Sequence, residues 1–321
     1  MPTRPRPSVR VVAALLLLAA SSRPLAAQQQ QQQPEDAAAA ASSGPSLCGA
    51  GIPEAEARGY VPLPRGDVFC PLIADPKGVR SFVSYLRGDA DEFATDVGSV
   101  GIADVFGLLR FGGRRPGNGV QLSLTGGVFA QFDVGSSSYD LINADYVIGV
   151  PLTVRVGGSS ARLRVYHQSS HLGDEFLLRS EHPERENLSF EALELLLSQD
   201  LRALHVYAGG EYYLNRHPGN LPSKLAHGGV ELRPAAALRF GTLGAVRFVA
   251  AGDVKAVSEN DDDWEVGVSA RAGFEIGRAR EGGVPSRRWS LLYEFYDGPS
   301  PYGQFFNRNV RLMGVGMHFT P

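Results

Sequence analysis

Apolar and polar residues alternate with a period of two through most of the chain after residue 79. The alternation is clearest over residues 140–156, where Ile148 and Leu152 share one parity and Asp145 and Arg155 share the other. Because successive side chains of a strand point to opposite faces, such a segment forms a strand with one apolar and one polar face. Repeated around a closed sheet, this pattern predicts an all-β fold, an antiparallel up-and-down transmembrane β-barrel.

About twelve segments carry the pattern and are predicted as strands. Their spans are 79–88, 97–112, 118–134, 140–157, 160–172, 187–201, 203–215, 225–241, 244–257, 263–278, 287–298 and 307–319. Connections after even-numbered strands are mostly tight, whereas those after odd-numbered strands are longer and polar, as in residues 173–186. An even number of strands with short turns at one end and long loops at the other is typical of bacterial outer-membrane barrels, so we expect that location.

Charged residues within the predicted strands fall mostly on the polar parity. They are Arg162, Arg164, Glu211, Glu231, Arg233, Arg239, Arg247, Asp253, Glu265, Arg271, Glu275 and Glu294. Since an arginine that faces lipid near the bilayer midplane costs about 2–4 kcal/mol, we expect these side chains in the lumen. Acids and bases nearly balance, which favours a lumen closed by ion pairs; a narrow channel is an alternative interpretation.

The N-terminus predicts export. Three arginines precede the apolar run 11–20, and Ala26 and Ala27 offer a cleavage site, so residues 1–27 are predicted to be a signal peptide. Removing this segment deletes four arginines and leaves 27 basic against 34 acidic residues, a net charge of −7. This charge argues against a nucleic-acid partner.

Two segments lie between the signal peptide and the predicted barrel, which we place at residues 79–321. Residues 28–46 are rich in glutamine and alanine and lack apolar periodicity, so they are predicted to be a disordered low-complexity linker. Residues 47–78 are predicted to be a periplasmic lead-in segment. They contain the only two cysteines of the chain, Cys48 and Cys70, and an oxidising periplasm favours a disulfide between them.

The last predicted strand places Met313, Val315, Met317 and Phe319 on one face. An aromatic residue close to the C-terminus resembles the assembly signal of outer-membrane barrels, which implies the barrel-assembly machinery as a partner. Membrane lipids and lipopolysaccharide are the surroundings expected for the apolar face.

A histidine and a serine on the apolar parity of the fifth predicted strand are the strongest candidates for chemistry. Leu163 and Val165 are predicted to face lipid, and His167 and Ser169 continue the same face, with Cβ atoms roughly 6–7 Å apart. A histidine base beside a serine nucleophile is the arrangement that activates acyl transfer.

Such a pair needs a third group to orient the imidazole, and three glutamates are candidates. Glu191 falls on the lipid-facing parity of the next strand, near the same end. Glu181 and Glu175 are closer in sequence to the histidine but belong to the long loop between the two strands.

A His-x-Ser pair on the outside of a barrel, with a polar partner on the next strand, resembles the outer-membrane phospholipase A and lipid A deacylase families. The resemblance implies a lipid hydrolase with His167 as base, Ser169 as nucleophile and Glu191 or Glu181 as orienting group. The phospholipase family has Asn-Gly after its serine where this chain has Ser170 and His171, so the calcium and oxyanion arrangement of that family is not carried over.

Over roughly residues 60–319 the chain resembles a bacterial family of outer-membrane barrels of unknown function. The stretch Gly-Asp-Val-Phe at 66–69 and the stretch Ser-Ser-His-Leu-Gly-Asp-Glu at 169–175 carry this resemblance. It implies a fold and a location but no activity.

The segment after the fifth strand also has a purely structural interpretation. Ser170, His171, Asp174 and Glu175 are predicted to form a polar cluster that braces the following loop, in a barrel with a structural or uncharacterised role. Metal binding by His167 together with the last three of these residues is a weaker alternative, because their spacing fits no standard site. No cofactor is expected, and the sequence leaves enzymatic activity open.

Overall fold

Antiparallel strands make up most of the chain that the computed structural model describes, which is residues 58–89, 96–113, 117–179, 187–234, 237–240, 244–258, 263–277 and 288–320. The strands are β1 (Gly59–Pro62), β2 (Ser81–Asp89), β3 (Asp96–Gly112), β4 (Gly119–Asp133), β5 (Asp140–Val156), β6 (Ser159–Leu172), β7 (Leu188–Leu201), β8 (Leu204–His217), β9 (Lys224–Leu232), β10 (Leu238–Phe240), β11 (Gly244–Ser258), β12 (Trp264–Gly277), β13 (Arg288–Pro299) and β14 (Asn309–Thr320). All described residues belong to one structural unit, Ser43–Pro321.

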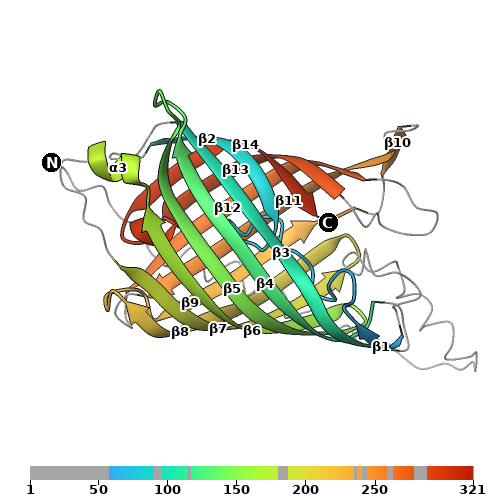
Figure 1. The fold of residues 1–321 in the computed structure, drawn as a ribbon. Helices are drawn as coiled ribbons and strands as arrows, with labels where there is room; N and C mark the ends of the chain where they lie inside the picture. Colours follow the sequence, from blue (N-terminus) through green and yellow to red (C-terminus); the bar gives the residue numbers. More distant parts are fainter. Residues whose placement is uncertain are drawn as a thin grey trace, which may run out of the picture. The chain divides into compact units, whose positions relative to one another are not determined.

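Twelve of these strands close into a barrel (Figure 1). Neighbours in the chain pair antiparallel around the ring, β14 returns to pair with β2, and the pairing of β3 with β4 completes the closure. The short strand β1 extends the edge of β3, and β10 extends the edge of β11. The predicted all-β fold and the predicted number of strands are confirmed.

One predicted strand is wrong in its extent. The segment 225–241 is divided, because β9 ends at Leu232 and β10 begins only at Leu238. Pro234 follows β9, and a proline has no backbone N–H to give to a neighbouring strand. The ladder therefore stops there, and the other strands begin and end close to their predicted positions.

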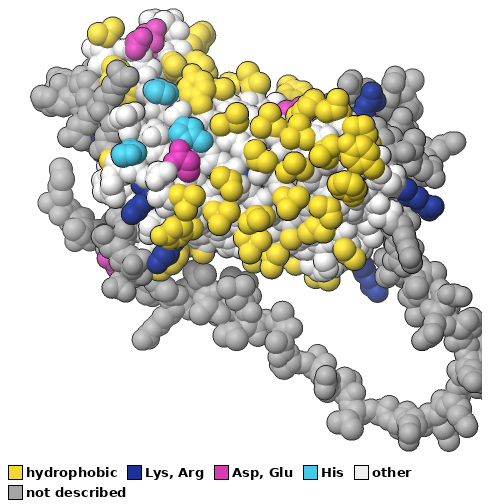
Figure 2. Space-filling model, turned by 60° about the horizontal axis from the view of Figure 1, so that its bottom comes forward, with side chains coloured by type: hydrophobic (Ala, Val, Ile, Leu, Met, Phe, Trp, Pro, Cys, Tyr) yellow, Lys and Arg dark blue, Asp and Glu magenta, His cyan; other side chains and the backbone are white. Residues whose placement is uncertain are grey.

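The wall of the barrel has an apolar exterior and a polar interior, as the alternation predicts. In β5, Ile148, Val150 and Leu152 are exposed, whereas Asp145 and Arg155 are buried on the opposite face. A broad belt of hydrophobic side chains covers the middle of the barrel on the face drawn in Figure 2. Because the barrel itself leaves these side chains uncovered, they are removed from water only if the barrel lies in an apolar environment.

Charged side chains fill the lumen, where they pair with one another. Those predicted to face inward that are buried are Arg164, Glu211, Glu231, Arg233, Arg247, Asp253, Arg271, Glu275 and Glu294. The guanidinium of Arg271 donates to Glu294 at 3.0 Å, and that of Arg247 donates to Glu275 at 2.8 Å. Acids and bases thus neutralise each other inside the wall.

The lumen also holds the end of the segment that precedes the barrel. Residues 63–80 leave β1, cross the interior and return to the wall as β2, and the side chains of Phe69, Leu72 and Ile73 are buried there. Phe69 packs against Leu196 of β7, and Arg271 of β12 donates to the carbonyl of Ile73 at 2.8 Å. We call residues 63–80 the plug; the sequence indicated a separate lead-in segment, and the structure places this part of it inside the barrel.

The long connections gather at the end of the barrel opposite the tight turns. The loop after β6 contains the helix α3 (Asp174–Arg179), and the loop after β13 contains a 3-10 turn, η4 (Gly303–Phe305), which folds into the mouth of the lumen. None of the described helices has the length and apolar character needed to cross a membrane. Residues 1–57 lie outside the described residues, so the signal peptide, the linker and the role of Cys48 stay predictions.

Candidate active site

A hydrogen bond joins His167 of β6 to Glu191 of β7 on the outside of the barrel. The two residues are direct partners in the antiparallel register, and 2.8 Å separates Nδ1 of the histidine from Oε1 of the glutamate. Their side chains are 42% and 38% exposed, so the pair is open to the surroundings of the barrel rather than to the lumen. Glu191 is therefore a candidate glutamate that the structure brings to the histidine.

Ser169 shares this outer face, two residues along β6. Exposure alternates strictly here, because Leu163 and Val165 are exposed, Tyr166 and Gln168 are buried, and Ser169 is partly exposed. The predicted outward direction of His167 and Ser169 is therefore confirmed.

The hydrogen bond fixes which atom of the imidazole is free to act as a base. A carboxylate only accepts, so Nδ1 of His167 carries the proton that it donates to Glu191, and Nε2 keeps its lone pair. Serine hydrolases use this arrangement, in which a carboxylate orients one ring nitrogen and the other takes the proton of the serine. Among the described side chains, His167 is bonded to Glu191 and not to Ser169, and catalytic hydrogen bonds of this kind often form only with substrate bound.

The histidine and the serine line a shallow groove in the outer wall. The groove has a volume of about 620 Å³ and runs across β6, β5, β4 and β3. Tyr146, Ile148 and Val128 form apolar parts of its lining. An apolar groove with a nucleophile and a base at one end is a suitable place for an ester that is attached to hydrocarbon chains.

The two other candidate glutamates belong to the connection between β6 and β7. Glu175 is exposed in the first turn of α3. Glu181 lies outside the described residues, so its role stays a prediction.

The four residues expected to brace the loop do not form one cluster. Ser170 faces the lumen, where its hydroxyl donates to Asp145 and accepts from the backbone N–H of Gln304 at 3.1 Å. His171 faces outward, with its ring 5.8 Å from that of Tyr146. Asp174 and Glu175 are exposed at the start of α3. The bracing role is therefore carried by Ser170, and it anchors η4 rather than the loop that follows β6.

A family model described as "Protein of unknown function (DUF1207)" matches residues 8–320. The chain belongs to this family. The resemblance inferred from the sequence is thereby confirmed, and it brings a fold class without an activity. No curated protein matches the chain by sequence.

Solved structures of outer-membrane phospholipases share the fold of this DUF1207 chain. Outer membrane phospholipase A from Escherichia coli superposes with a TM-score of 0.51 at 12% identity, covering 77% of this chain and 93% of that protein. The calcium-bound dimer of the outer membrane phospholipase from Salmonella typhi gives 0.50 at 13% identity, with 77% and 94% covered. The translocator domain of the autotransporter NalP from Neisseria meningitidis gives only 0.34 at 12% identity, with 77% and 90% covered. At these identities the likeness to the two phospholipases shows a shared barrel fold and nothing further.

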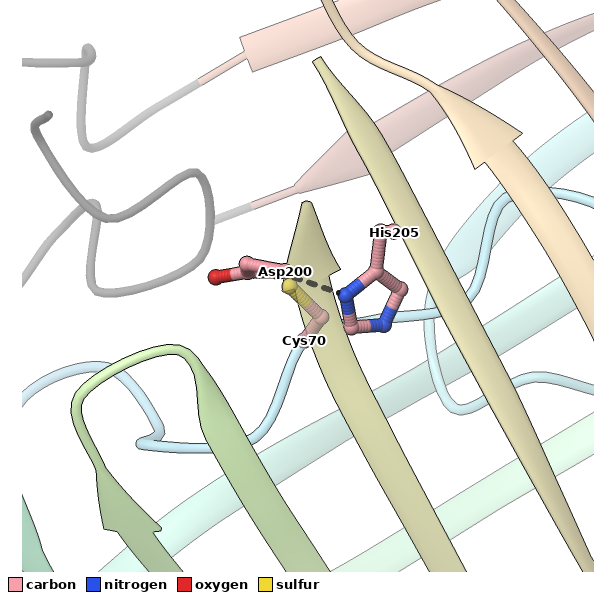
Figure 3. A group of neighbouring side chains, drawn as sticks. All are labelled: Cys70, Asp200 and His205. Carbon is pink, nitrogen blue, oxygen red and sulfur yellow. Dashed lines mark hydrogen bonds and ion pairs between the residues drawn. The ribbon is translucent and has the colours of Figure 1, made fainter. Parts of the chain in front are cut away.

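Three potential metal ligands of the DUF1207 chain meet where the plug approaches β7 and β8. Ligand atoms of Cys70, Asp200 and His205 lie within 4.8 Å of one another (Figure 3). However, the sulfur of Cys70 is part of a disulfide, and Asp200 also pairs with Arg155. A disulfide sulfur is not the thiolate that zinc requires, so this group does not fit a metal site. The sequence-derived alternative fails on geometry, because His167 and His171 are four positions apart on a strand and thus about 13 Å apart.

Two acidic residues with notable positions in the structure were not among the residues predicted from the sequence. Glu194 of β7 faces inward and pairs with both Arg162 and Arg164, each at 2.6 Å. Asp104 of β3 is exposed on the outer wall and lines the same groove as His167. The parity rule would have found both, since Glu194 alternates with outward leucines and Asp104 stands on the apolar parity of its strand.

Proposed function

We propose that this chain is a lipid acyl hydrolase of the bacterial outer membrane, with Ser169 as nucleophile, His167 as general base and Glu191 as the group that orients the imidazole. The observation that carries the proposal is the hydrogen bond between Nδ1 of His167 and Oε1 of Glu191 on the apolar exterior. A polar pair at that position is costly next to hydrocarbon. Asn215 of β8 also bonds the carboxylate of Glu191, which holds it beside the histidine on the outer face.

The chemistry would proceed by acyl transfer. Ser169 Oγ attacks the carbonyl carbon of a lipid ester while His167 Nε2 takes the hydroxyl proton. The proton then passes to the leaving alkoxide, which departs as an alcohol, and an acyl-serine remains. Water, deprotonated by the same imidazole, attacks the acyl-serine and releases a fatty acid.

The location supports lipids as the substrates. Leu163, Val165 and Leu193 surround the pair on the exterior and are exposed. A soluble ester would have to enter the membrane to reach this site, whereas phospholipids and lipopolysaccharide are already there. The apolar wall and the aromatic Phe319 of β14 are also the features that favour an outer-membrane location and assembly by the barrel-assembly machinery.

A closed barrel without chemistry is the second candidate, and the bonds from Ser170 to Asp145 and to the η4 backbone favour it. A channel is disfavoured, because the plug and its ion pairs occupy the lumen. Release of fatty acid that depends on Ser169 separates the hydrolase from the closed barrel.

The test uses purified full-length protein in detergent micelles, with phospholipid and, separately, lipid A as substrates. We expect Ser169→Ala to lower the release of fatty acid by about a thousandfold or more, because the nucleophile is lost. Ser159→Ala is the matched control, since Ser159 is an exposed serine on the same face of β6 but at its opposite end, bonded to Gln199 and away from the proposed chemistry. Release that is the same in all three proteins, or no release by the wild type, would leave the closed barrel as the function.

A further inference from the structure

Three residues extend the row of His167 across the outer wall. In the register of the sheet, His167 is opposite Ile148, Ile148 is opposite Gly126, and Gly126 is opposite Asp104. Neighbouring strands are about 4.8 Å apart, so Asp104 lies about 14 Å from the histidine along this row. The histidine and the aspartate are therefore the two ends of the groove described above.

The middle of the groove is open because it contains a glycine. Gly126 occupies an outward position of β4 but has no side chain to fill it. A Cβ atom built there would meet nothing within 4 Å. On either side, Val128 and Ile148 continue the apolar lining, and the small Ala103 and Gly127 lie beneath. The groove thus has an open floor between apolar side chains and leads from Ser169 toward Asp104.

Asp104 interrupts the apolar exterior where the wall itself changes. β2 pairs with β3 only as far as Phe82 and Gly101, and β1 takes up the edge of β3 again at Leu109. In the interval, the carboxyl group of Asp104 accepts the backbone N–H of Val105 at 2.7 Å. The side chain is thus held by its own strand and stands as a polar barrier at the far end of the groove.

A second hollow begins on the other side of this barrier. It has a volume of about 310 Å³ and is lined by the aromatic side chains of Trp289 and Phe319, and Asp104 belongs to the lining of both hollows. Ser81 also lines both hollows, but its hydroxyl is bonded to the backbone of Ala103. Asp104 is therefore the one charged residue between the two spaces among the residues that line both of them.

We propose that the groove from Ser169 to Asp104 holds one acyl chain of the substrate and that Asp104 limits its length, so that the preferred substrates are lipids with acyl chains of about ten to twelve carbons. Three strand spacings separate Asp104 from His167, about 14 Å, and Ser169 lies two residues further along β6, which makes its span to Asp104 about 16 Å. At a rise of roughly 1.3 Å per methylene in an extended chain, these spans correspond to about ten to twelve carbons. This inference rests on the proposed hydrolase function, since it concerns the substrate of the same site. A longer chain must either lie against the carboxyl group or bend out of the groove, which disfavours its reactive pose.

The test is a chain-length profile measured on the full-length protein in mixed micelles. The probes are phosphatidylcholines with two identical acyl chains of 8, 10, 12, 14, 16 or 18 carbons, and the readout is the part of kcat/KM for fatty acid release that Ser169→Ala abolishes. We expect the wild type to prefer 10 to 12 carbons by about tenfold over 16, the lower end of what a methylene is worth in a hydrophobic pocket because the groove is open.

Two variants should move this profile in opposite directions. Gly126→Leu fills the groove and should shift the preference to 8 carbons, whereas Asp104→Ala joins the two hollows and should raise kcat/KM for 16 carbons to that for 12. Asp104→Asn keeps an acceptor for Val105 and should give an intermediate shift, which covers the case that the alanine variant fails to fold. Gly252→Leu is the control, because Gly252 is also open, with nothing within 4 Å of an added Cβ, and it lies on β11 outside the groove.

The outcomes distinguish the two proposals. Release that depends on Ser169 but has the same length profile in wild type, Gly126→Leu and both Asp104 variants would overturn the length limit and leave the hydrolase in place. A profile shifted equally by Gly252→Leu would overturn it too. No release that depends on Ser169 would remove the hydrolase and the length limit together.

Discussion

Asp75 and Lys255 lie 180 positions apart in the chain and form an ion pair inside the lumen, with 2.7 Å between Oδ1 and Nζ. The aspartate belongs to the plug and the lysine to β11, so the pair ties the plug to the wall. The side chain of Asp75 is only 9% exposed and that of Lys255 23%. Removing one charge of such a pair weakens the compensation of the other charge.

The first prediction is that Asp75→Asn destabilises the folded barrel by about 1.5–3 kcal/mol, because it removes the charge-assisted hydrogen bond from Lys255 and leaves only the more distant carboxylates of Asp253 and Glu211 to compensate the ammonium group. The matched control is Asp297→Asn at the loop end, which breaks a 2.6 Å pair with Arg311 whose side chains are 41% and 56% exposed. An exposed pair of this kind contributes less than about 1 kcal/mol. Denaturant unfolding in detergent measures both values, and equal losses would contradict the assigned role of the plug pair.

The second prediction concerns the pH dependence of this pair. Burial by itself raises the pKa of Asp75, but the charge of Lys255 and the hydrogen bonds to the carboxylate outweigh it, and the pKa lies below its ordinary value of 3.8. A carboxyl group whose pKa is lower in the folded state than in the unfolded state stabilises the fold at any pH above its unfolded-state pKa. This contribution is lost as the pH falls from the unfolded-state pKa to the folded-state pKa. The stability difference between wild type and Asp75→Asn should therefore stay constant from neutral pH to about 5 and shrink only below 3.8. A difference already lost by about pH 5 would show that the pKa is not lowered.

Strand parity predicted the wall of the barrel because the physical cause acts at every second residue. Each outward position meets an apolar surrounding and each inward position meets the charged lumen, so Leu152 and Arg155 fall on the faces that the alternation assigns. The same rule places His167, Ser169 and Glu191 on one surface of the barrel. The break at Pro234 had a signal in the sequence, and weighing it would have divided the eighth predicted strand.

The plug could not be predicted in this way. Phe69, Leu72 and Ile73 have no strand or helix period, and their burial depends on a lumen that is built by distant strands. Gln304 and Phe305 are similar, since they are folded into the mouth by contacts with Ser170 and Phe82. Contacts between segments so far apart in the chain leave no local pattern to find.

The third prediction separates the two roles of neighbouring serines on β6. Ser170→Ala removes a buried hydroxyl that donates to Asp145 and accepts from the backbone N–H of Gln304, and the loss of these two buried hydrogen bonds costs about 1–3 kcal/mol. Amide exchange in residues 300–308 should therefore become faster, while fatty acid release stays within about twofold of the wild type. A large loss of activity without faster exchange would move the catalytic role from Ser169 toward Ser170.

The fourth prediction tests the orienting role of Glu191. Glu191→Gln keeps an amide oxygen that accepts from Nδ1 of His167 but removes the charge that stabilises the protonated imidazole, so kcat should fall by about 10²–10⁴ while KM changes little. Steady-state kinetics of fatty acid release measure both constants. Glu175→Gln on α3 is the control, because that carboxylate is exposed and away from the histidine. A loss in the control as large as in Glu191→Gln would favour an orienting group in the loop.

The fifth prediction tests whether the exterior faces hydrocarbon at all. Leu195 of β7 is 49% exposed and stands in register with Leu163 and Leu152, well inside the apolar belt, whereas Val156 is 71% exposed at the last position of β5, beside a tight turn. An arginine near the midplane of a bilayer costs about 2–4 kcal/mol and one near the interface about 0–1 kcal/mol. For the barrel folded in lipid vesicles, Leu195→Arg should therefore reduce the free energy of unfolding by about 2–4 kcal/mol, and Val156→Arg should reduce it by about 0–1 kcal/mol. Equal effects would mean that depth along the wall has no energetic meaning, and a site that depends on lipid reaching His167 from the outside would lose its basis.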